Sequence, residues 1–279
     1  MKDKRVVTLQ DISCFGKCSI TVALPVISAM GISCSVIPTA VLSTHTGGFE
    51  GFTFRDLTDD IPLVSDHWQK QGFSFDGIYT GYLGSERQIR LIKEFIDRFK
   101  KDTFVFVDPA MADNGRLYTG FDMNFVYAMS SLCAVADLAV PNITEASMML
   151  GLEYKERGTY GWDYVKELLR GVCSFGAKTA VLTGVSMDGV TQGCVSYSRE
   201  TGEYESYFRE HIPVESHGTG DVFASALFGA LILDKPLSEA MKIAVDFTIG
   251  SIKATAGDDT HWFGVKFEQC IPGLIDSIK

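Results

Sequence analysis

Short apolar runs alternate along the chain with longer stretches of helical periodicity. The run RVVTL at residues 5–9 is typical of a buried strand, and residues 19–31 have a helical pattern that ends at Gly31. Residues 85–102 give the clearest helix, because isoleucine and phenylalanine recur there at helical spacing and Ser85 stands at the N-cap. Further strands are predicted at 33–39, 76–81, 103–108, 136–141 and 178–184. This alternation predicts an α/β fold: a central, mostly parallel β-sheet flanked by helices on both faces.

Other patterns complete the expected organisation. The glycine-rich stretch STHTGGFEGF at 43–52 predicts a mobile loop, the centre of a small flap at 40–55. The polar-edged runs at 193–198 and 204–210 predict an antiparallel pair of strands. Helices are expected at 57–71, twice after Asp221 and once near the C-terminus. No repeat or low-complexity linker divides the chain, so a single domain over residues 1–279 is predicted.

Composition narrows the class of protein. With 46% hydrophobic and 22% charged residues, the chain has the composition of a globular protein with a large core. A net charge of −10 argues against a nucleic-acid or anionic-membrane surface. No apolar run reaches membrane-spanning length and the N-terminus does not resemble a signal peptide, so a cytoplasmic protein is expected. The seven scattered cysteines lack C-x-x-C spacing and are expected to be reduced thiols.

Unusual polar residues follow the predicted strands. The segments GYLGS, DPAMADNG, PNITEA and GVSMDG each come after an apolar strand. Because ligands of open α/β sheets bind at the carboxyl ends of the strands, these loops are expected to line one crevice with Asp108, Asp113, Asn142, Glu145 and Thr183. Clustered acids are tolerated beside cations, which favours a site for Mg²⁺ and phosphate groups. Asn142 and Glu145 also have the spacing of a helix capping box.

The segment GTGD at residues 218–221 carries the strongest chemical signal. The N–H groups of Gly218, Thr219 and Gly220 at the start of a helix can bind an anion, and Asp221 can accept a proton from an attacking hydroxyl. A donor turn beside a carboxylate is what phosphoryl transfer to an alcohol requires, although Asp221 could instead be an N-cap alone. The segment is neither a P-loop nor a dinucleotide-binding fingerprint.

The chain resembles the ribokinase-like superfamily in the order of four motifs along the sequence: GYLGS, DPAMADNG, PNITE and GTGD. Within this superfamily, the chain resembles the pyridoxal/pyridoxamine kinases in three motifs: GYLGS, D-P-x-M-x-D-N-G-x-L-Y at 108–118, and S-x-H-T-G at 43–47. The likeness extends from residue 6 to beyond residue 250. The resemblance implies ATP-dependent phosphorylation of the 5′-hydroxymethyl group of pyridoxal, pyridoxine or pyridoxamine, with Mg²⁺ and ATP, by a homodimer.

The resemblance also implies roles for individual residues. It implies that Asp221 is the catalytic base. It also implies that the backbone N–H groups of Gly218, Thr219 and Gly220 form the anion hole. It puts Asp113 and Glu145 on the Mg–ATP side, as the metal-side acids, with Asn142 and Thr183 along the phosphate path. Around the substrate ring it implies three residues: Ser13, Thr46 and Tyr82.

The chain departs from the motifs of these kinases at two places, and other functions are possible alternatives. Thr219 stands where the family usually has alanine or valine, and residues 13–19 differ from the usual loop. Hydroxymethylpyrimidine kinases of thiamin synthesis share the fold and similar motifs, and a non-catalytic ligand-binding protein on the same fold is a further alternative. A nicotinamide-dependent oxidoreductase is disfavoured, because no early G-x-G-x-x-G occurs. His45 and His217 are left without an assigned role.

Overall fold

The computed structural model describes residues 3–214 and 217–279, which form two compact units. The first unit combines Met1–Phe104 with Ile212–Lys279, and the second is Val105–His211. The two units do not test the single domain predicted over residues 1–279, which stays a prediction. Within the described ranges, no helix is long and apolar enough to cross a membrane.

The first unit is built on a short parallel sheet. Strand β1 (Arg5–Ser13) lies between β2 (Ser33–Leu42) and β4 (Gly77–Thr80) and pairs in parallel with both. Strand β3 (Phe54–Asp56) pairs antiparallel with the end of β2, so the 43–52 loop joins two paired strands. Every residue of β4 is buried, as expected for a strand covered on both faces.

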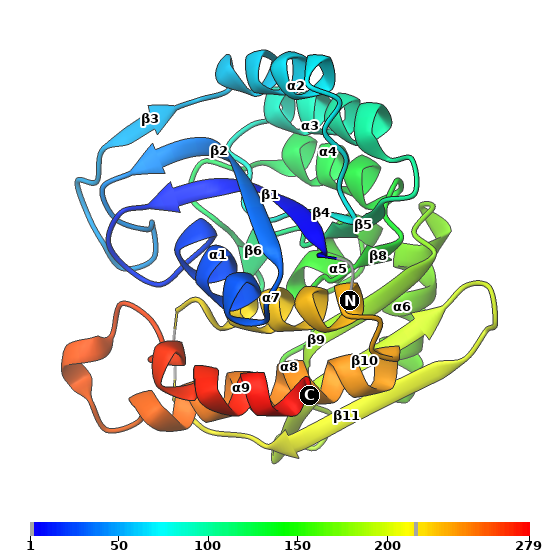
Figure 1. Ribbon diagram of the computed structural model, residues 1–279. Helices are drawn as coiled ribbons and strands as arrows, with labels where there is room; N and C mark the ends of the chain where they lie inside the picture. The colour runs from blue at the N-terminus through cyan, green and yellow to red at the C-terminus, as the bar shows by residue number, and fades with distance from the viewer. Residues whose placement is uncertain (1–2, 215–216) are drawn as a thin grey trace. The chain divides into compact units, whose positions relative to one another are not determined.

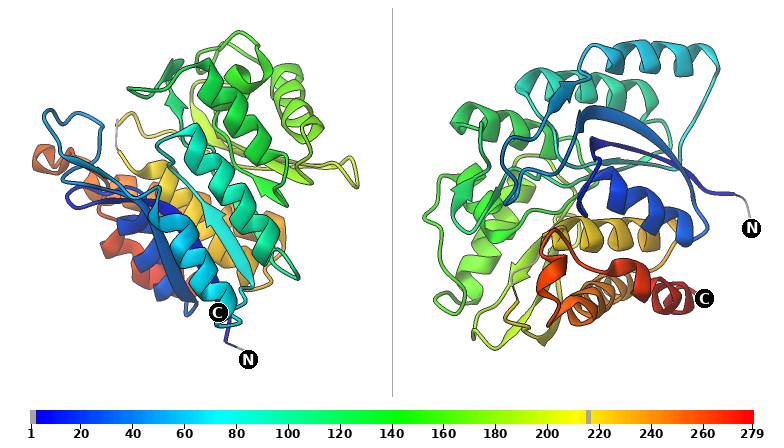
Figure 2. Two further views of the ribbon diagram at one scale, coloured as in Figure 1. Left: turned by 90° about the horizontal axis from the view of Figure 1, so that it is seen from above. Right: turned by 90° about the vertical axis from the view of Figure 1, so that its left-hand side faces the viewer.

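Helices cover both faces of this sheet. In Figure 1, α1 (Ile20–Ala29) and α7 (Thr219–Ile232) lie on one side of the strands, and α2 (Asp60–Lys70) and α3 (Glu86–Phe99) lie on the other. Helix α7 is buried almost all round because it packs between α1 and α8 (Leu237–Thr255), an arrangement visible in the right-hand view of Figure 2. Two 3₁₀ turns, Asp259–His261 and Phe267–Cys270, lead to α9 (Ile271–Ser277).

The second unit repeats the α/β pattern and adds an antiparallel edge. Strands β5 (Phe104–Val107), β8 (Leu138–Ala139) and β9 (Thr179–Val185) pair in parallel. Strands β10 (Thr191–Ser198) and β11 (Tyr204–Glu210) form the predicted antiparallel pair. The remaining elements are three helices and a small hairpin: α4 (Met123–Cys133), α5 (Ile143–Leu150), α6 (Trp162–Ser174), and β6 (Ala112–Asp113) with β7 (Arg116–Leu117).

The predicted fold class is confirmed: α/β, with mostly parallel strands flanked by helices. Helix α3 begins where predicted, since the Ser85 side chain accepts the N–H of Gln88 at 3.2 Å. The seven cysteines are all free, but only Cys133, Cys173 and Cys194 are fully buried.

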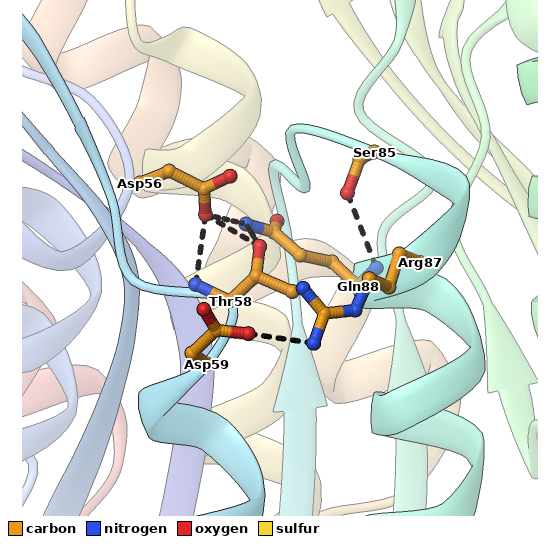
Figure 3. A network of polar contacts seen from close by, with 6 residues as sticks. All are labelled: Asp56, Thr58, Asp59, Ser85, Arg87 and Gln88. Atoms are coloured by element: carbon orange, nitrogen blue, oxygen red, sulfur yellow. Dashed lines mark hydrogen bonds and ion pairs between the residues drawn. The ribbon is translucent and has the colours of Figure 1, made fainter.

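One buried amide joins α3 to the hairpin that carries the 43–52 loop (Figure 3). Gln88 is 1% exposed and donates to the Thr39 carbonyl of β2 at 2.9 Å and to the Thr58 hydroxyl at 3.0 Å. Its own oxygen accepts the N–H of Gly84 at 2.7 Å, within the GYLGS segment. This side chain therefore fixes the loop after β4 against β2.

Replacing Gln88 by alanine is expected to lower the free energy of unfolding by about 1–3 kcal/mol, because it leaves the Gly84 N–H and the Thr39 carbonyl without their partner. Arg87→Ala is the matched control. Arg87 makes an ion pair with Asp59 at 2.6 Å, but its side chain is 56% exposed, so the loss is at most about 1 kcal/mol. Urea unfolding measures both, and equal losses would contradict the assignment.

Candidate active site

Helix α7 begins at a turn that only glycine can form. Gly218 has φ 76°, and a Cβ at this position would lie 1.7 Å from the carbonyl oxygen of Lys17. A Cβ at Gly220 would meet no atom within 4 Å, so the space beside the first turn is open. Thr219 and Gly220 are the first two residues of α7, with N–H groups that no earlier helical carbonyl accepts. The predicted anion-binding residues thus lie together at the N-terminus of a buried helix.

Asp221 lies in the first turn of α7 and is half-buried. Burial raises the pKa of its carboxyl to about 7, the backbone N–H of Ser19 opposes this rise, and the nearby Asp11 adds to it. A carboxyl that exchanges its proton near neutral pH is suited to act as a general base.

A second carboxyl lies at the end of β1. Asp11 is 3% exposed and accepts the hydroxyl of Ser13, itself 1% exposed, at 2.9 Å. Burial raises the pKa of Asp11, against hydrogen bonds from the side chains of Ser19 and Ser13. Ser13 was predicted for the site from the sequence and Asp11 was not, because the burial of Asp11 and its bond to Ser13 depend on the fold.

Tyr82 follows β4 in the GYLGS segment and is half-buried. Burial raises the pKa of its phenol to about 12, and the charge of Asp11 contributes to this rise. The phenol therefore stays protonated at neutral pH and can donate a hydrogen bond. Of the predicted substrate residues, Ser13 and Tyr82 both interact with Asp11.

The 43–52 loop is held by an aromatic cluster. His45 bonds the Phe263 carbonyl through Nε2 at 2.9 Å, and its Nδ1 accepts the N–H of Gly47 at 3.1 Å. Phe49 packs on Trp262 with ring centroids 4.5 Å apart. Thr46 lies between these anchors and is half-buried. The loop is thus held by aromatic packing, while its mobility and the ligand contact of Thr46 stay predictions.

His217 lies against the same loop. Its ring is 5.1 Å from that of His45, and a Cβ at Gly47 would lie 2.8 Å from the His217 ring. Burial, and the neighbouring His217, lower the pKa of His45. The two histidine rings therefore pack beside the loop near the start of α7.

The second unit brings the four predicted nucleotide-side residues together. Asn142 is the N-cap of α5, and its side chain donates to the Ala112 carbonyl of β6 at 2.8 Å. Thr183 forms an isolated parallel bridge with Asn142, and its N–H donates to the Pro141 carbonyl at 3.0 Å. Asp113 follows Ala112 in the hairpin and is exposed. Glu145 completes the group from the first turn of α5.

Glu145 forms the capping box that its spacing predicted. One carboxylate oxygen accepts the N–H of Asn142 at 2.8 Å and the other accepts the N–H of Met111 at 3.1 Å, while the Asn142 side chain accepts the N–H of Glu145 at 2.9 Å. The side chain is 3% exposed, and burial raises its pKa against these bonds, with Asp113 adding to the rise. Asp108, on the same segment as Asp113, is also buried.

These contacts bear on the predicted metal. Both oxygens of Glu145 already accept backbone N–H groups, whereas Asp113 is exposed and accepts the N–H of Asn114 at 2.8 Å. Among the residues described, no group of three or more His, Cys, Asp or Glu side chains could hold a metal by itself. An exposed hard-oxygen ligand fits an Mg²⁺ ion whose other ligands are phosphate oxygens and water.

Comparison with known proteins identifies the family. The sequence profile described as phosphomethylpyrimidine kinase matches residues 16–263. The chain belongs to this family. Its predicted resemblance to the pyridoxal kinases of the ribokinase-like superfamily is confirmed by the relatives below.

Three solved structures have the same fold as this chain. A candidate phosphomethylpyrimidine kinase from Bacteroides thetaiotaomicron, crystallised with pyridoxal, is 36% identical, with a TM-score of 0.92 over 98% of this chain and 96% of that one. Pyridoxal kinase from Lactobacillus plantarum is 28% identical, with a TM-score of 0.89 over 98% and 97%. Pyridoxal kinase from Leishmania donovani in complex with ADP and pyridoxamine is 24% identical, with a TM-score of 0.86 over 98% and 96%, and shows the fold alone.

A curated relative has the other ring substrate in its name. Hydroxymethylpyrimidine/phosphomethylpyrimidine kinase from Aquifex aeolicus is 25% identical over 183 residues, 66% of this chain and 69% of its own length. The chain is therefore a kinase of the pyridoxal and phosphomethylpyrimidine kinase group.

The raised pKa of Glu145 predicts how stability of this kinase depends on pH. Between the usual value of 4.5 and the raised folded value, the folded protein keeps a proton that the unfolded chain has lost. This contribution is fully present below pH 4.5 and is lost as pH rises through the folded pKa. Glu145→Gln should therefore flatten the fall in unfolding free energy toward alkaline pH.

Urea unfolding at a series of pH values measures this effect, and Glu167→Gln, an exposed position on α6, is the matched control. The control should keep the wild-type slope. A Glu145→Gln protein with the wild-type slope would show that Glu145 is ionised in the folded state.

Proposed function

We propose that this chain is an ATP-dependent kinase that phosphorylates the 5′-hydroxymethyl group of a vitamin B6 vitamer. The observation that carries the proposal is the carboxyl of Asp221, with a pKa of about 7, in the first turn of α7 beside the Gly218 turn. As the substrate alcohol attacks the γ-phosphorus, its proton passes to Asp221, the new O–P bond forms, and the bond to ADP breaks. The N–H groups of Gly218, Thr219 and Gly220 stabilise the charge on the transferred group.

The second unit supplies the nucleotide side of this proposal. Asn142 and Thr183 would line the phosphate path, and Asp113 would hold Mg²⁺, with Glu145 on the same side of the site. Bound Mg²⁺ would neutralise charge on the phosphates. The exposed Asp113 beside the Asn142–Thr183 bridge supports this role, and so does the ADP bound by the Leishmania donovani kinase.

On the substrate side, the proposal gives Ser13, Thr46 and Tyr82 contacts with the ring. Pyridoxal in the Bacteroides thetaiotaomicron structure and the pyridoxal kinase of Lactobacillus plantarum support a B6 vitamer. The second candidate is hydroxymethylpyrimidine, because the family and the Aquifex aeolicus relative are named for it. The retained acids Asp113, Glu145 and Asp221 argue against a non-catalytic binding protein. One kinase domain, a homodimer and a cytoplasmic location stay predictions.

The substrate is tested by ADP release from ATP with pyridoxal, pyridoxine, pyridoxamine and hydroxymethylpyrimidine. We expect the highest kcat/KM with a B6 vitamer, and a kcat lowered roughly 10²-fold or more in Asp221→Asn with that substrate, because the proton acceptor is gone. A higher kcat/KM for hydroxymethylpyrimidine would favour the second candidate. An Asp221→Asn enzyme with wild-type kcat would remove Asp221 from the mechanism.

The metal side is tested by titrating Mg²⁺ at fixed ATP. Asp113→Ala should need a higher Mg²⁺ concentration for half-maximal rate, because it removes an exposed carboxylate beside the phosphate path. Asp163→Ala, at an exposed acid in the first turn of α6, is the control and should keep the wild-type midpoint. If the Asp113→Ala curve overlays that of the wild type, Asp113 does not hold the metal.

A further inference from the structure

The 43–52 loop is joined to two other segments of the first unit by one buried residue, His45, which is 5% exposed. Its backbone N–H donates to the Phe15 carbonyl at 3.2 Å. Its ring nitrogen Nε2 bonds the Phe263 carbonyl at 2.9 Å, and Nδ1 bonds the backbone N–H of Gly47 at 3.1 Å. The position of the loop therefore depends on both the backbone and the ring of His45.

The Phe263 carbonyl is shared between this loop and the segment before α1. Besides its bond to Nε2 of His45, it accepts the backbone N–H of Lys17 at 3.2 Å. The carbonyl of Lys17 is in turn the group that approaches Gly218, where a Cβ would lie 1.7 Å from its oxygen. A continuous series of contacts thus connects the His45 ring with the glycine turn that starts α7.

The partners of the His45 ring determine which of its nitrogens carries the proton. A carbonyl oxygen only accepts, so Nε2 is protonated and donates to Phe263. A backbone N–H only donates, so Nδ1 carries no proton and accepts from Gly47. The neutral ring with its proton on Nε2 satisfies both bonds. The charged imidazolium has a proton on each nitrogen, so it would bring two donors together at Gly47 and lose that bond.

The ring of His45 is enclosed by close neighbours. A Cβ on Gly16 would lie 2.1 Å from its Cδ2 atom, so the backbone at Gly16 lies against one edge of the ring. The ring centroids of Phe49 and His217 lie 4.9 and 5.1 Å from that of His45. A protonated ring at this position would therefore break the Gly47 bond rather than turn to a new partner.

The surroundings of His45 favour its neutral form. Burial lowers its pKa below the usual 6.5, the bond to Phe263 opposes this, and the facing His217 adds to the lowering. Because both ring bonds are to backbone groups, the neutral form needs no counter-ion. The other titratable side chains on the segments 13–19, 43–52, 217–221 and 258–268 are the ion pairs Lys17–Glu268 and Lys266–Asp258, and the residues Cys14, Cys18, Glu50, Asp221, Asp259 and His261.

We propose that neutral His45 is a positioning residue for the substrate ring, because it holds Thr46 and Gly47 against the segment that leads to the Gly218 turn. The inference rests on the proposed function only in taking Thr46 as a contact of the ring. Protonation of His45 breaks the bond to Gly47 and releases this part of the loop, so the ring substrate binds less tightly in acid. The residues proposed for Mg–ATP belong to the second unit, so the KM for ATP does not follow this change.

The pH dependence of KM tests this role. Between about pH 7.5 and about pH 5, the wild-type KM for pyridoxal should rise at least about threefold, the effect of one lost hydrogen bond, while the KM for ATP changes less than about twofold. His45→Asn can accept the Gly47 N–H through its side-chain oxygen and does not titrate, so its KM for pyridoxal should stay level. A His45→Asn enzyme with the wild-type rise would overturn the proposal.

Two further variants separate the bond from the charge and from other histidines. His45→Gln keeps a donor for the Phe263 carbonyl but removes the acceptor for Gly47, so its KM for pyridoxal should be raised at every pH. His67→Gln, at an exposed position of α2, is the control and should keep the wild-type pH dependence. Loss of the pH dependence in His67→Gln would overturn the assignment to His45. Circular dichroism at each pH shows which variants are folded.

A readout on the wild-type protein needs neither turnover nor a folded variant. In protein labelled with ¹⁵N, the His45 ring is assigned through bonds to its own backbone, and nuclear magnetic resonance reports which nitrogen carries the proton. We expect a proton on Nε2 alone at neutral pH, and a Gly47 amide signal that shifts as the ring titrates below pH 6.5. A proton on Nδ1 at neutral pH, or a Gly47 signal that does not follow the ring, overturns the inference while leaving a kinase activity standing. Failure of the proposed function appears instead as absence of ADP release with every ring alcohol, which leaves these signals unchanged.

Discussion

The close approach of Gly218 to the Lys17 carbonyl determines where helix α7 begins. A methyl group on Gly218 would lie 1.7 Å from that oxygen, so any other residue would push the helix start and the 13–19 loop apart. The same loop is held from the other side, since the Lys17 N–H donates to the Phe263 carbonyl at 3.2 Å and a Cβ on Gly264 would lie 2.3 Å from the Lys17 Cβ. With the loop fixed in this way, the N-terminus of α7 has one position, and Asp221 lies in its first turn.

In the second unit, backbone N–H groups hold the carboxylate of Glu145 in place. Glu145 accepts from Asn142 and Met111, which belong to α5 and to the segment before β6. Capping by Glu145 is therefore compatible with its proposed role on the nucleotide side. The capping box holds the hairpin against α5, and the hairpin presents Asp113 at its exposed corner, where Asn114 and Gly115 both have positive φ.

The local sequence pattern was enough to predict helices and strands that have a periodic apolar face. It did not predict features that depend on contacts between residues far apart in the sequence. Helix α3 was predicted with its N-cap, because its apolar stripe and Ser85 are both local signals. The grouping of Asp113, Asn142, Glu145 and Thr183 followed from the rule for the ends of parallel strands, and the structure brings them together. The β6–β7 hairpin was missed, since strands of two residues carry no periodicity. Asp11 was missed because its burial and its bond to Ser13 are properties of the folded chain and have no periodic signal. The ring substrate could not be derived either, since two ring alcohols need the same phosphate chemistry.

Burial of three carboxyl groups lowers the free energy of unfolding as pH rises, and a purely structural role would not require this loss. Asp11, Glu145 and Asp221 all have pKa values raised by burial, so each opposes stability as pH rises through its folded pKa. Glutamine could serve the third position of a capping box without this penalty. Asparagine could serve as well as aspartate where only a serine hydroxyl has to be bound. The chain has the ionisable residue at all three positions, and ionisation is the property that the neutral amides lack. Under the proposed function, Asp221 has to ionise to take up the substrate proton, and Glu145 would lie on the cation side of the nucleotide.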